Sequence, residues 1–228
     1  MQDAGISLSC LARLTTALPA AALLACLATA LLAQYEKATT THCEVSEFLP
    51  SISAVVGVEP QRFLWSAAIA VTTGPRLLFC QLQRSELATK FPSHQAAVRL
   101  NTGLNTLEIL ALLTLSLVPS QDIFVIHATA FSAFLLSSLS SMLVLTYYLH
   151  DGRRTRLKRV TVKLSLLCVI MAAYFYQRHN AQCEPYVYSL FAACEYAVVG
   201  LNMVWHTAVI RQFCGLTMLV ERSGDFIM

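Results

Sequence analysis

The sequence predicts an all-α, polytopic membrane protein: a six-transmembrane-helix bundle with both termini on the cytoplasmic side. Three observations predict this class. The 228 residues are 56% hydrophobic and only 13% charged, whereas a soluble domain carries about 25% charged residues. The apolar residues gather in six blocks, each close to the roughly 20 residues that a helix needs to cross a bilayer. Basic residues collect on one side of these blocks, which sets the orientation.

The six expected spans follow one another with mostly short connections. The exception is the stretch of about 29 residues between the first two spans. Because no soluble segment is visible between the spans, residues 1–228 are expected to form a single integral-membrane domain. The spans are Leu14–Ala33, Phe63–Leu82, Leu100–Val118, Ile123–Leu149, Val160–Tyr176 and Tyr186–Ile210.

The first span has two interpretations. Arg13 precedes an apolar run that ends near the small residues 28–30, as in a cleaved signal peptide. The run is longer than the apolar part of such a peptide, which usually has about 7–15 residues. We therefore expect a retained membrane anchor. Cleavage would leave the orientation of the other five spans unchanged.

The orientation follows from the basic residues. The loop 151–159 holds five of them, and others flank the connection between the second and third spans or follow the sixth span. By the positive-inside rule this side is cytoplasmic. A short basic run beside a membrane is better explained by lipid head groups than by nucleic acid, so no nucleic-acid partner is expected.

The second and third spans carry charged residues at depth. Asn101, Asn105 and Glu108 are spaced i, i+4 and i+7, so they share one face of the third span. Arg76 follows Gly74–Pro75, where the second span is expected to kink. A rise of 1.5 Å per residue places Arg76 about 10 Å and Glu108 about 13 Å from the cytoplasmic boundary. We predict an Arg76–Glu108 pair, which either fixes helix packing or lines a head-group cavity.

The fourth and sixth spans add further polar residues. His127 lies about one turn inside the fourth span. It is either a general base, since an imidazole titrates near neutrality, or an interfacial histidine bonded to a loop. Glu195, Asn202 and His206 form a polar stripe on the sixth span. Ionisable groups inside a membrane almost always point into the bundle or a wet cavity, so Glu195 and Asn202 are site candidates, whereas His206 lies close to the cytoplasmic boundary.

The non-cytoplasmic loops contain two of the eight cysteines, Cys43 and Cys183. Disulfides persist on that side of a secretory-pathway membrane, so a Cys43–Cys183 bridge is expected. It would gather polar residues suited to a phosphate or sugar head group. No ligand spacing in the sequence is diagnostic of a metal, and no metal site is expected. The polar residues beside the two cysteines are His42, Arg178, His179 and Asn180.

Several short sequence motifs carry a family resemblance. Between about residues 35 and 210 they resemble, in the same order, the motifs of the post-GPI attachment to proteins factor 2 family, a family of GPI-anchor lipid-remodelling factors. The N-terminal 30 residues and the tail after residue 211 carry no such motif. The strings are THC (41–43), LPSISAVVG (49–57), PQRFLW (60–65), GPR (74–76), RLNTGLNTLEILALLTL (99–115), IHATAF (126–131), SSLSSML (137–143), RHNAQCE (178–184) and EYAVVGLNMVWH (195–206).

The resemblance implies a multi-pass protein of the Golgi or endoplasmic reticulum membrane that acts on GPI-anchored proteins. In this family's process an unsaturated sn-2 chain is removed from the anchor, and a saturated chain, typically stearoyl, is then added to the lyso-GPI intermediate. The family is described as the acyltransferase for this reacylation or as required for it. The implied partners are GPI-anchored proteins, lyso-GPI lipid and membrane phospholipids. The implied co-substrate is an acyl donor, either acyl-CoA or a phospholipid, with no bound cofactor.

The resemblance supplies no catalytic residues, so roles come from the chemistry of the side chains. Reacylation needs a base for the sn-2 hydroxyl; His127 is the first choice and His179 the second, with Glu195 orienting a histidine. Three functions stay open: an acyltransferase, a non-catalytic partner that presents lyso-GPI to a separate enzyme, and a phospholipid transporter or scramblase. The expected substrate-binding residues are Arg76, Asn105, Glu108, Arg178 for the inositol phosphate, Asn180, Asn202 and His42.

Overall fold

Six long helices form the body of the protein in a computed structural model that describes residues 5–150 and 152–219. Each of them, with its adjoining turns, is long and apolar enough to cross a membrane. The all-α class and the six-span prediction are therefore confirmed, and the protein is a multi-pass membrane protein. The long helices are α1 (Leu8–Ala33), α4 (Gln61–Lys90), α5 (Gln95–Leu117), α6 (Phe124–Leu143), α7 (Thr155–Gln182) and α8 (Val187–Ile210).

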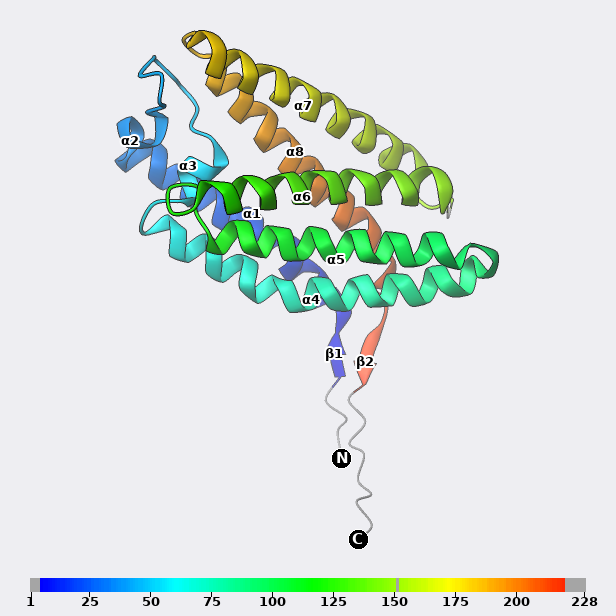
Figure 1. The fold of residues 1–228 in the computed structure, drawn as a ribbon. Coiled ribbons are helices and arrows are strands. Elements are labelled where there is room, and N and C mark those ends of the chain that lie inside the picture. Colours follow the sequence, from blue (N-terminus) through cyan, green and yellow to red (C-terminus); the bar gives the residue numbers. More distant parts are fainter. Residues whose placement is uncertain (1–4, 151, 220–228) are drawn as a thin grey trace.

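Short elements connect the long helices. Two lie in the segment between α1 and α4, which the sequence predicted only as a connection. The strands β1 and β2 pair antiparallel and join the two ends of the described chain (Figure 1). The short elements are β1 (Gly5–Ser7), α2 (Tyr35–Thr39), α3 (Ile52–Val56), the 3-10 turns η1 (Pro92–His94) and η3 (Arg211–Phe213), the π-helical turn η2 (Val144–Tyr148) and β2 (Thr217–Leu219).

Several helices extend beyond the apolar runs that predicted them. Helix α4 continues to Lys90, eight residues past the predicted end of its span, because nothing in its polar last turns stops a helix before Pro92. It also runs as one element through Pro75. Helix α7 begins five residues before the expected start of its span and ends six residues after the expected end. Apolar length predicts the membrane-crossing part of a helix and not its full extent.

The long helices form two groups around a common interior (Figure 1). Neighbours α4, α5 and α6 lie side by side, and α1 packs against α4. Helices α7 and α8 form an antiparallel pair on the other side. Helices α6 and α7 are close at their connecting turn and diverge toward the opposite end of the molecule (Figure 1).

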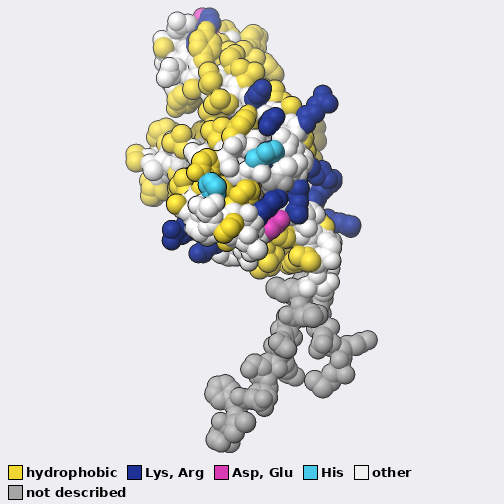
Figure 2. Space-filling view, turned by 90° about the vertical axis from the view of Figure 1, so that its right-hand side faces the viewer, with side chains coloured by type: hydrophobic (Ala, Val, Ile, Leu, Met, Phe, Trp, Pro, Cys, Tyr) yellow, Lys and Arg dark blue, Asp and Glu magenta, His cyan; other side chains and the backbone are white. Residues whose placement is uncertain are grey.

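The two ends of the bundle differ in charge. At one end Arg153 donates to Glu86 on α4 and to Gln212 on η3, both at 2.8 Å, and β1–β2 lies near it. Figure 2 looks onto this end and shows Lys and Arg side chains around it with few acidic ones. At the opposite end Arg62 pairs with Asp122 at 2.9 Å. The first and last described elements, β1 and β2, thus lie at the same, basic end of the bundle. The cytoplasmic placement of this end stays a prediction from the positive-inside rule.

The interior contains small and polar side chains as well as large apolar ones. Cys26 and Ala30 of α1 are fully buried against Trp65 and Ile69 of α4. Val55 of α3 is buried in the same cluster, so α3 is part of the bundle interior. Many large apolar side chains face outward instead, such as Leu136, which is 67% exposed. This arrangement is typical of membrane bundles, where lipid solvates the outer face.

Candidate active site

A cavity of about 600 Å³ lies inside the bundle. This volume falls within the roughly 300–1,000 Å³ of small-molecule sites. Its wall comes from all six long helices and from α3, and it is largely apolar. The acidic, basic and histidine side chains on the wall are Arg76, His127, Glu195 and His206, and Asn202 also lines it.

The cavity reaches the outer surface between α6 and α7. Phe124 and Ser132 of α6 line it and are exposed, as are Ala173 and Tyr176 of α7. These are the two helices that diverge in Figure 1. Because both helices are membrane spans by length and composition, the opening faces the side of the bundle that lipid covers. A molecule with acyl chains can enter there without leaving the bilayer.

His127 is held in one tautomer on the cavity wall. Its Nδ1 lies 2.8 Å from the carbonyl oxygen of Val118. A carbonyl only accepts hydrogen bonds, so in the neutral imidazole Nδ1 carries the proton and Nε2 has the lone pair. Nε2 accepts a hydrogen bond from the Ser53 hydroxyl at 2.9 Å. His127 is therefore bonded to the connection between α5 and α6, as one of the two interpretations expected, and its role as a general base stays a prediction.

Glu195 has a different partner from the one expected. The sequence expectation was that this carboxylate orients a histidine. In the structure its Oε2 accepts from the backbone N–H of Ile52 at 3.1 Å. Ile52 is the first residue of α3 and precedes Ser53. Glu195 thus anchors α3 to α8. The backbone carbonyl of Val118, and not Glu195, orients the His127 imidazole.

The predicted Arg76–Glu108 pair is present and belongs to a larger network. One carboxylate oxygen, Glu108 Oε1, accepts from Arg76 Nη2 at 3.2 Å, Asn202 Nδ2 at 2.9 Å and His206 Nε2 at 2.7 Å. Glu108 itself is 1% exposed, whereas its three donors line the cavity. The carboxylate fixes α4 and α8 against α5, and its donors form the polar part of the cavity wall.

Asn105 serves packing away from the large cavity. Its Nδ2 donates to Gln83 Oε1 at 3.3 Å, and its Oδ1 accepts from Ser141 at 2.9 Å. These bonds join α4, α5 and α6. Asn105 does not line the large cavity. It lines a second space of about 20 Å³, the size of a single water site, which shares Arg76 and His206 with the large cavity.

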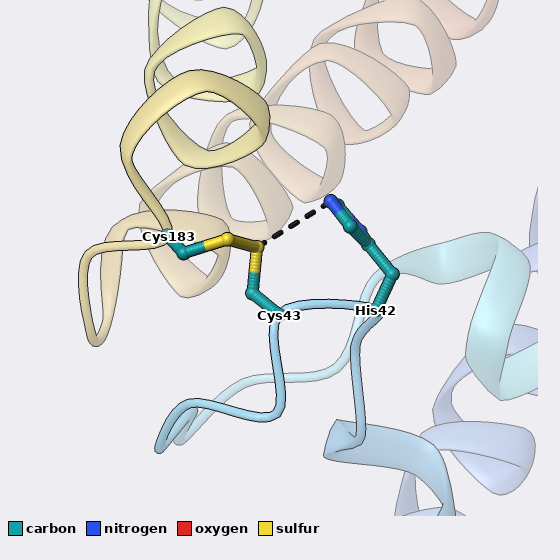
Figure 3. A group of neighbouring side chains, drawn as sticks. All are labelled: His42, Cys43 and Cys183. Atoms are coloured by element: carbon teal, nitrogen blue, oxygen red, sulfur yellow. Dashed lines mark hydrogen bonds between the residues drawn. A yellow bond between two sulfur atoms is a disulfide. The ribbon is translucent and has the colours of Figure 1, made fainter.

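The Cys43–Cys183 disulfide is present, with the two Cα atoms 5.3 Å apart. Figure 3 shows His42 beside the bridge, its Nε2 3.4 Å from Cys43 Sγ. The three residues have the donor atoms of a metal site within 4.8 Å of one another. Sulfur ligates metals as a thiolate, and both sulfurs here are bonded to each other, so this group does not form a metal centre. His42 is not among the cavity-lining residues.

His179 lies beside the Cys43–Cys183 disulfide and His42, and outside the cavity. Its side chain is fully buried between the His42 and Tyr188 rings. Its Nδ1 is 3.7 Å from Glu47 Oε1. Glu47 also accepts from the backbone N–H groups of Tyr188 and Ser189 at 3.3 and 2.8 Å, where an α-helix leaves donors unsatisfied. His179 thus belongs to the docking of segment 41–51 on α8, and the cavity that holds His127 does not reach it.

Arg178 uses all three of its guanidinium nitrogens in hydrogen bonds to neighbouring side chains. Its guanidinium forms a two-point bond to Glu184, with distances of 2.6 and 3.0 Å, and also donates to Tyr174 at 2.9 Å. These hydrogen bonds hold the pKa of the Glu184 carboxyl below its usual value. Neither Arg178 nor its exposed neighbour Asn180 lines the cavity. The expected role of Arg178 on the inositol phosphate stays a prediction.

Sequence reasoning missed Ser53, Glu47 and Ser189. Ser53 lies in LPSISAVVG, where Pro50 and Ser51 are a recognisable helix-start signal. Ser51 does cap α3 by accepting from Ala54 N–H at 3.3 Å. A five-residue helix has too little periodicity to indicate which side chain faces a cavity, so the partner of His127 could not be identified.

Comparisons with known proteins agree with this architecture and with the strings in the sequence. A family model described as Frag1/DRAM/Sfk1/Cwh43P N-terminal domain matches residues 7–215. The chain is 34% identical over 224 residues to Post-GPI attachment to proteins factor 2 of Caenorhabditis elegans, covering 90% of this chain and 85% of that protein. It is 32% identical over 226 residues to Acyltransferase PGAP2 of Xenopus tropicalis, covering 92% and 89%. No solved structure matches it. The chain belongs to the post-GPI attachment to proteins factor 2 family, within the wider Frag1/DRAM/Sfk1/Cwh43P group.

Proposed function

We propose that the protein takes part in GPI-anchor maturation as a membrane-bound acyltransferase of the Golgi membrane. It reacylates the sn-2 position of a lyso-GPI intermediate with a saturated chain taken from acyl-CoA or from a phospholipid. Its partners are GPI-anchored proteins that carry the lyso-GPI lipid. The observation that carries the proposal is the His127 imidazole, oriented as a base on the wall of a cavity that opens toward lipid.

The names of the relatives support the process and the chemistry separately. The Caenorhabditis elegans relative is named for post-GPI attachment to proteins. The Xenopus tropicalis relative is named an acyltransferase. The cavity has the apolar wall that an acyl chain needs, and it opens between α6 and α7. These features favour lipid chemistry over chemistry on a soluble substrate.

The geometry of His127 suits acyl transfer. A hydroxyl attacks an acyl carbonyl only weakly until a base takes its proton. Nε2 of His127 has a lone pair because Nδ1 is committed to the Val118 carbonyl. Nε2 can therefore take the proton of the sn-2 hydroxyl during attack and return it to the leaving group of the donor. Arg76 lies on the same wall and is bonded to Glu108 through Nη2; the remaining N–H groups of its guanidinium can bind an oxygen of the bound lipid.

The test is reconstitution with defined lipids. The purified protein is placed in liposomes with lyso-GPI and a labelled acyl donor, with acyl-CoA in one arm and phospholipid in the other, and the diacyl product is measured. His127→Gln should lower the rate by about 10²–10⁴-fold, the usual contribution of a general base. His150→Gln changes an exposed histidine just after η2 and should leave the rate unchanged.

The outcomes separate the three functions. Product formation that depends on His127 supports an enzyme. Lyso-GPI binding without product in either arm contradicts the proposal and indicates a partner that presents the lipid to a separate enzyme. Movement of phospholipid between leaflets without any acyl donor indicates a transporter. A His127→Gln protein with the wild-type rate also contradicts the proposed role of this residue.

A further inference from the structure

The Ser53 side chain has the geometry of an activated nucleophile. Its hydroxyl donates to Nε2 of His127 at 2.9 Å. The direction of this bond is set by the carbonyl of Val118, 2.8 Å from Nδ1, which requires the proton to be on Nδ1. A hydroxyl bonded to a base that a third group orients is the arrangement of serine nucleophiles. The third group is a backbone carbonyl here instead of a carboxylate.

Ser53 is also held firmly in place. It is the second residue of α3, whose first N–H is bonded to Glu195 of α8 at 3.1 Å. Ser51 caps the same helix, and Val55 is fully buried against α1 and α4. Helix α3 is therefore fixed to three long helices. The distance between the hydroxyl and the imidazole is set by packed elements and not by a mobile loop.

Both members of the pair line the cavity of about 600 Å³. A hydrogen bond that only fastened α3 to α6 would need no open volume beside it. The pair instead faces a space that is mainly apolar and that opens between α6 and α7. The carbonyl of an acyl donor whose chain lies in this space can approach the Ser53 oxygen.

We propose that Ser53 is the nucleophile of the transfer and holds the acyl chain as a covalent ester between donor and acceptor. This inference rests on the proposed function and specifies its mechanism. The observed hydrogen bond favours it over direct attack by the acceptor, because the Ser53 hydroxyl already occupies the lone pair of His127 Nε2. Once Ser53 is acylated it has no proton to donate, and Nε2 becomes available to the sn-2 hydroxyl.

The reaction has two balanced steps. In the first, Ser53 Oγ forms a bond to the acyl carbon, the bond from that carbon to the donor oxygen or sulfur breaks, and the serine proton passes through Nε2 to the leaving group. In the second, the sn-2 oxygen of the lyso lipid forms a bond to the same carbon and the Ser53 ester breaks. The proton of the sn-2 hydroxyl passes through Nε2 back to Ser53. No oxidant or reductant is needed.

The experiment traps the intermediate. The full-length protein in liposomes is incubated with an alkyne-tagged acyl donor and no lyso lipid, using acyl-CoA and phospholipid in separate arms. It is then denatured, digested and sequenced by mass spectrometry. We expect the chain on Ser53 as an ester that resists neutral hydroxylamine and disappears when lyso-GPI is added. The arm that gives the adduct identifies the donor.

Three variants complete the test. Ser53→Ala should lose the adduct and reduce product formation by at least about 100-fold, in the range for loss of an activated nucleophile. Ser53→Cys replaces the hydroxyl with a thiol and should give a hydroxylamine-sensitive thioester at the same position, which a purely structural role would not produce. Ser46→Ala changes an exposed serine of the same segment that does not line the cavity, and should behave as wild type.

The outcomes are distinct for the two proposals. Wild-type protein that forms product, together with a Ser53→Ala protein that does so at a similar rate, overturns the covalent step and leaves the proposed function standing. An adduct confined to cysteines also overturns it. A wild-type protein that forms neither adduct nor product with either donor overturns the proposed function itself.

Discussion

Glu108 shows most clearly how single residues stabilise this bundle. A carboxylate buried to 1% exposure is costly unless hydrogen bonds compensate for the loss of water. Three donors from two other helices meet at one of its oxygens. The Arg76 side chain is itself only 12% exposed, so removing Glu108 leaves a buried charge on Arg76 without its partner.

This arrangement predicts strong coupling between Arg76 and Glu108. Glu108→Gln should destabilise the protein by about 3–5 kcal/mol, the usual cost of breaking a buried pair from one side. Arg76→Met should also destabilise the protein, but by less, because Asn202 and His206 still donate to the carboxylate. The double variant has no unpaired charge, so its destabilisation should be smaller than the sum of the two single effects. Thermal or denaturant unfolding in detergent measures all three, and additive effects would show that the two charges do not interact.

The sequence predicts the partner of a buried polar residue when depth in the membrane and spacing along the helix determine that partner. The Arg76–Glu108 pair could be predicted because both residues fall at similar depths in neighbouring antiparallel spans. The addition of Asn202 and His206 to the same oxygen could not, because it depends on the rotation of α8 against α5. For the same reason the sequence placed Glu195 inside the bundle but did not predict its partner, the backbone N–H of Ile52.

At the scale of elements, the segment between α1 and α4 determines the site. Its sequence predicts a connection, and in the structure it is a docked unit. The Cys43–Cys183 bridge joins it to the end of α7, Glu47 bonds to the start of α8, and α3 enters the bundle. The disulfide could be predicted from topology and redox compartment. The entry of α3 could not, because a five-residue apolar run does not distinguish a surface turn from a buried helix.

The bridge should therefore contribute measurably to stability. Cys43→Ser should lower the free energy of unfolding by about 2–4 kcal/mol, the usual effect of removing a disulfide. A fall in melting temperature of the detergent-purified protein measures it. Cys10→Ser changes an exposed free cysteine and serves as the control. Equal melting temperatures for Cys43→Ser and wild type would contradict the role of the bridge, as would alkylation of both thiols in native protein.

At the scale of the whole molecule, the divergence of α6 and α7 is the decisive feature (Figure 1). The number of spans, their order and the basic end all follow from composition and charge pattern. The cavity does not, because it results from the angle between two helix groups, which side-chain packing sets and hydropathy does not encode. Without that angle, His127 and Ser53 would lie in a closed core, and no lipid could reach them.

The central claim is that an acyl chain occupies the cavity between α6 and α7, and photocrosslinking tests it most directly. Liposomes containing the protein and a lyso lipid with a diazirine in its chain are irradiated, and the labelled peptides are identified. We predict labels on cavity-lining residues such as Phe131 and Ala172, and their loss in Ala128→Trp, which fills the cavity. Leu136→Trp, on the outer face of the same helix, should retain them. Labels confined to outward-facing residues such as Leu167 and Ile170, equal in both variants, would contradict the claim.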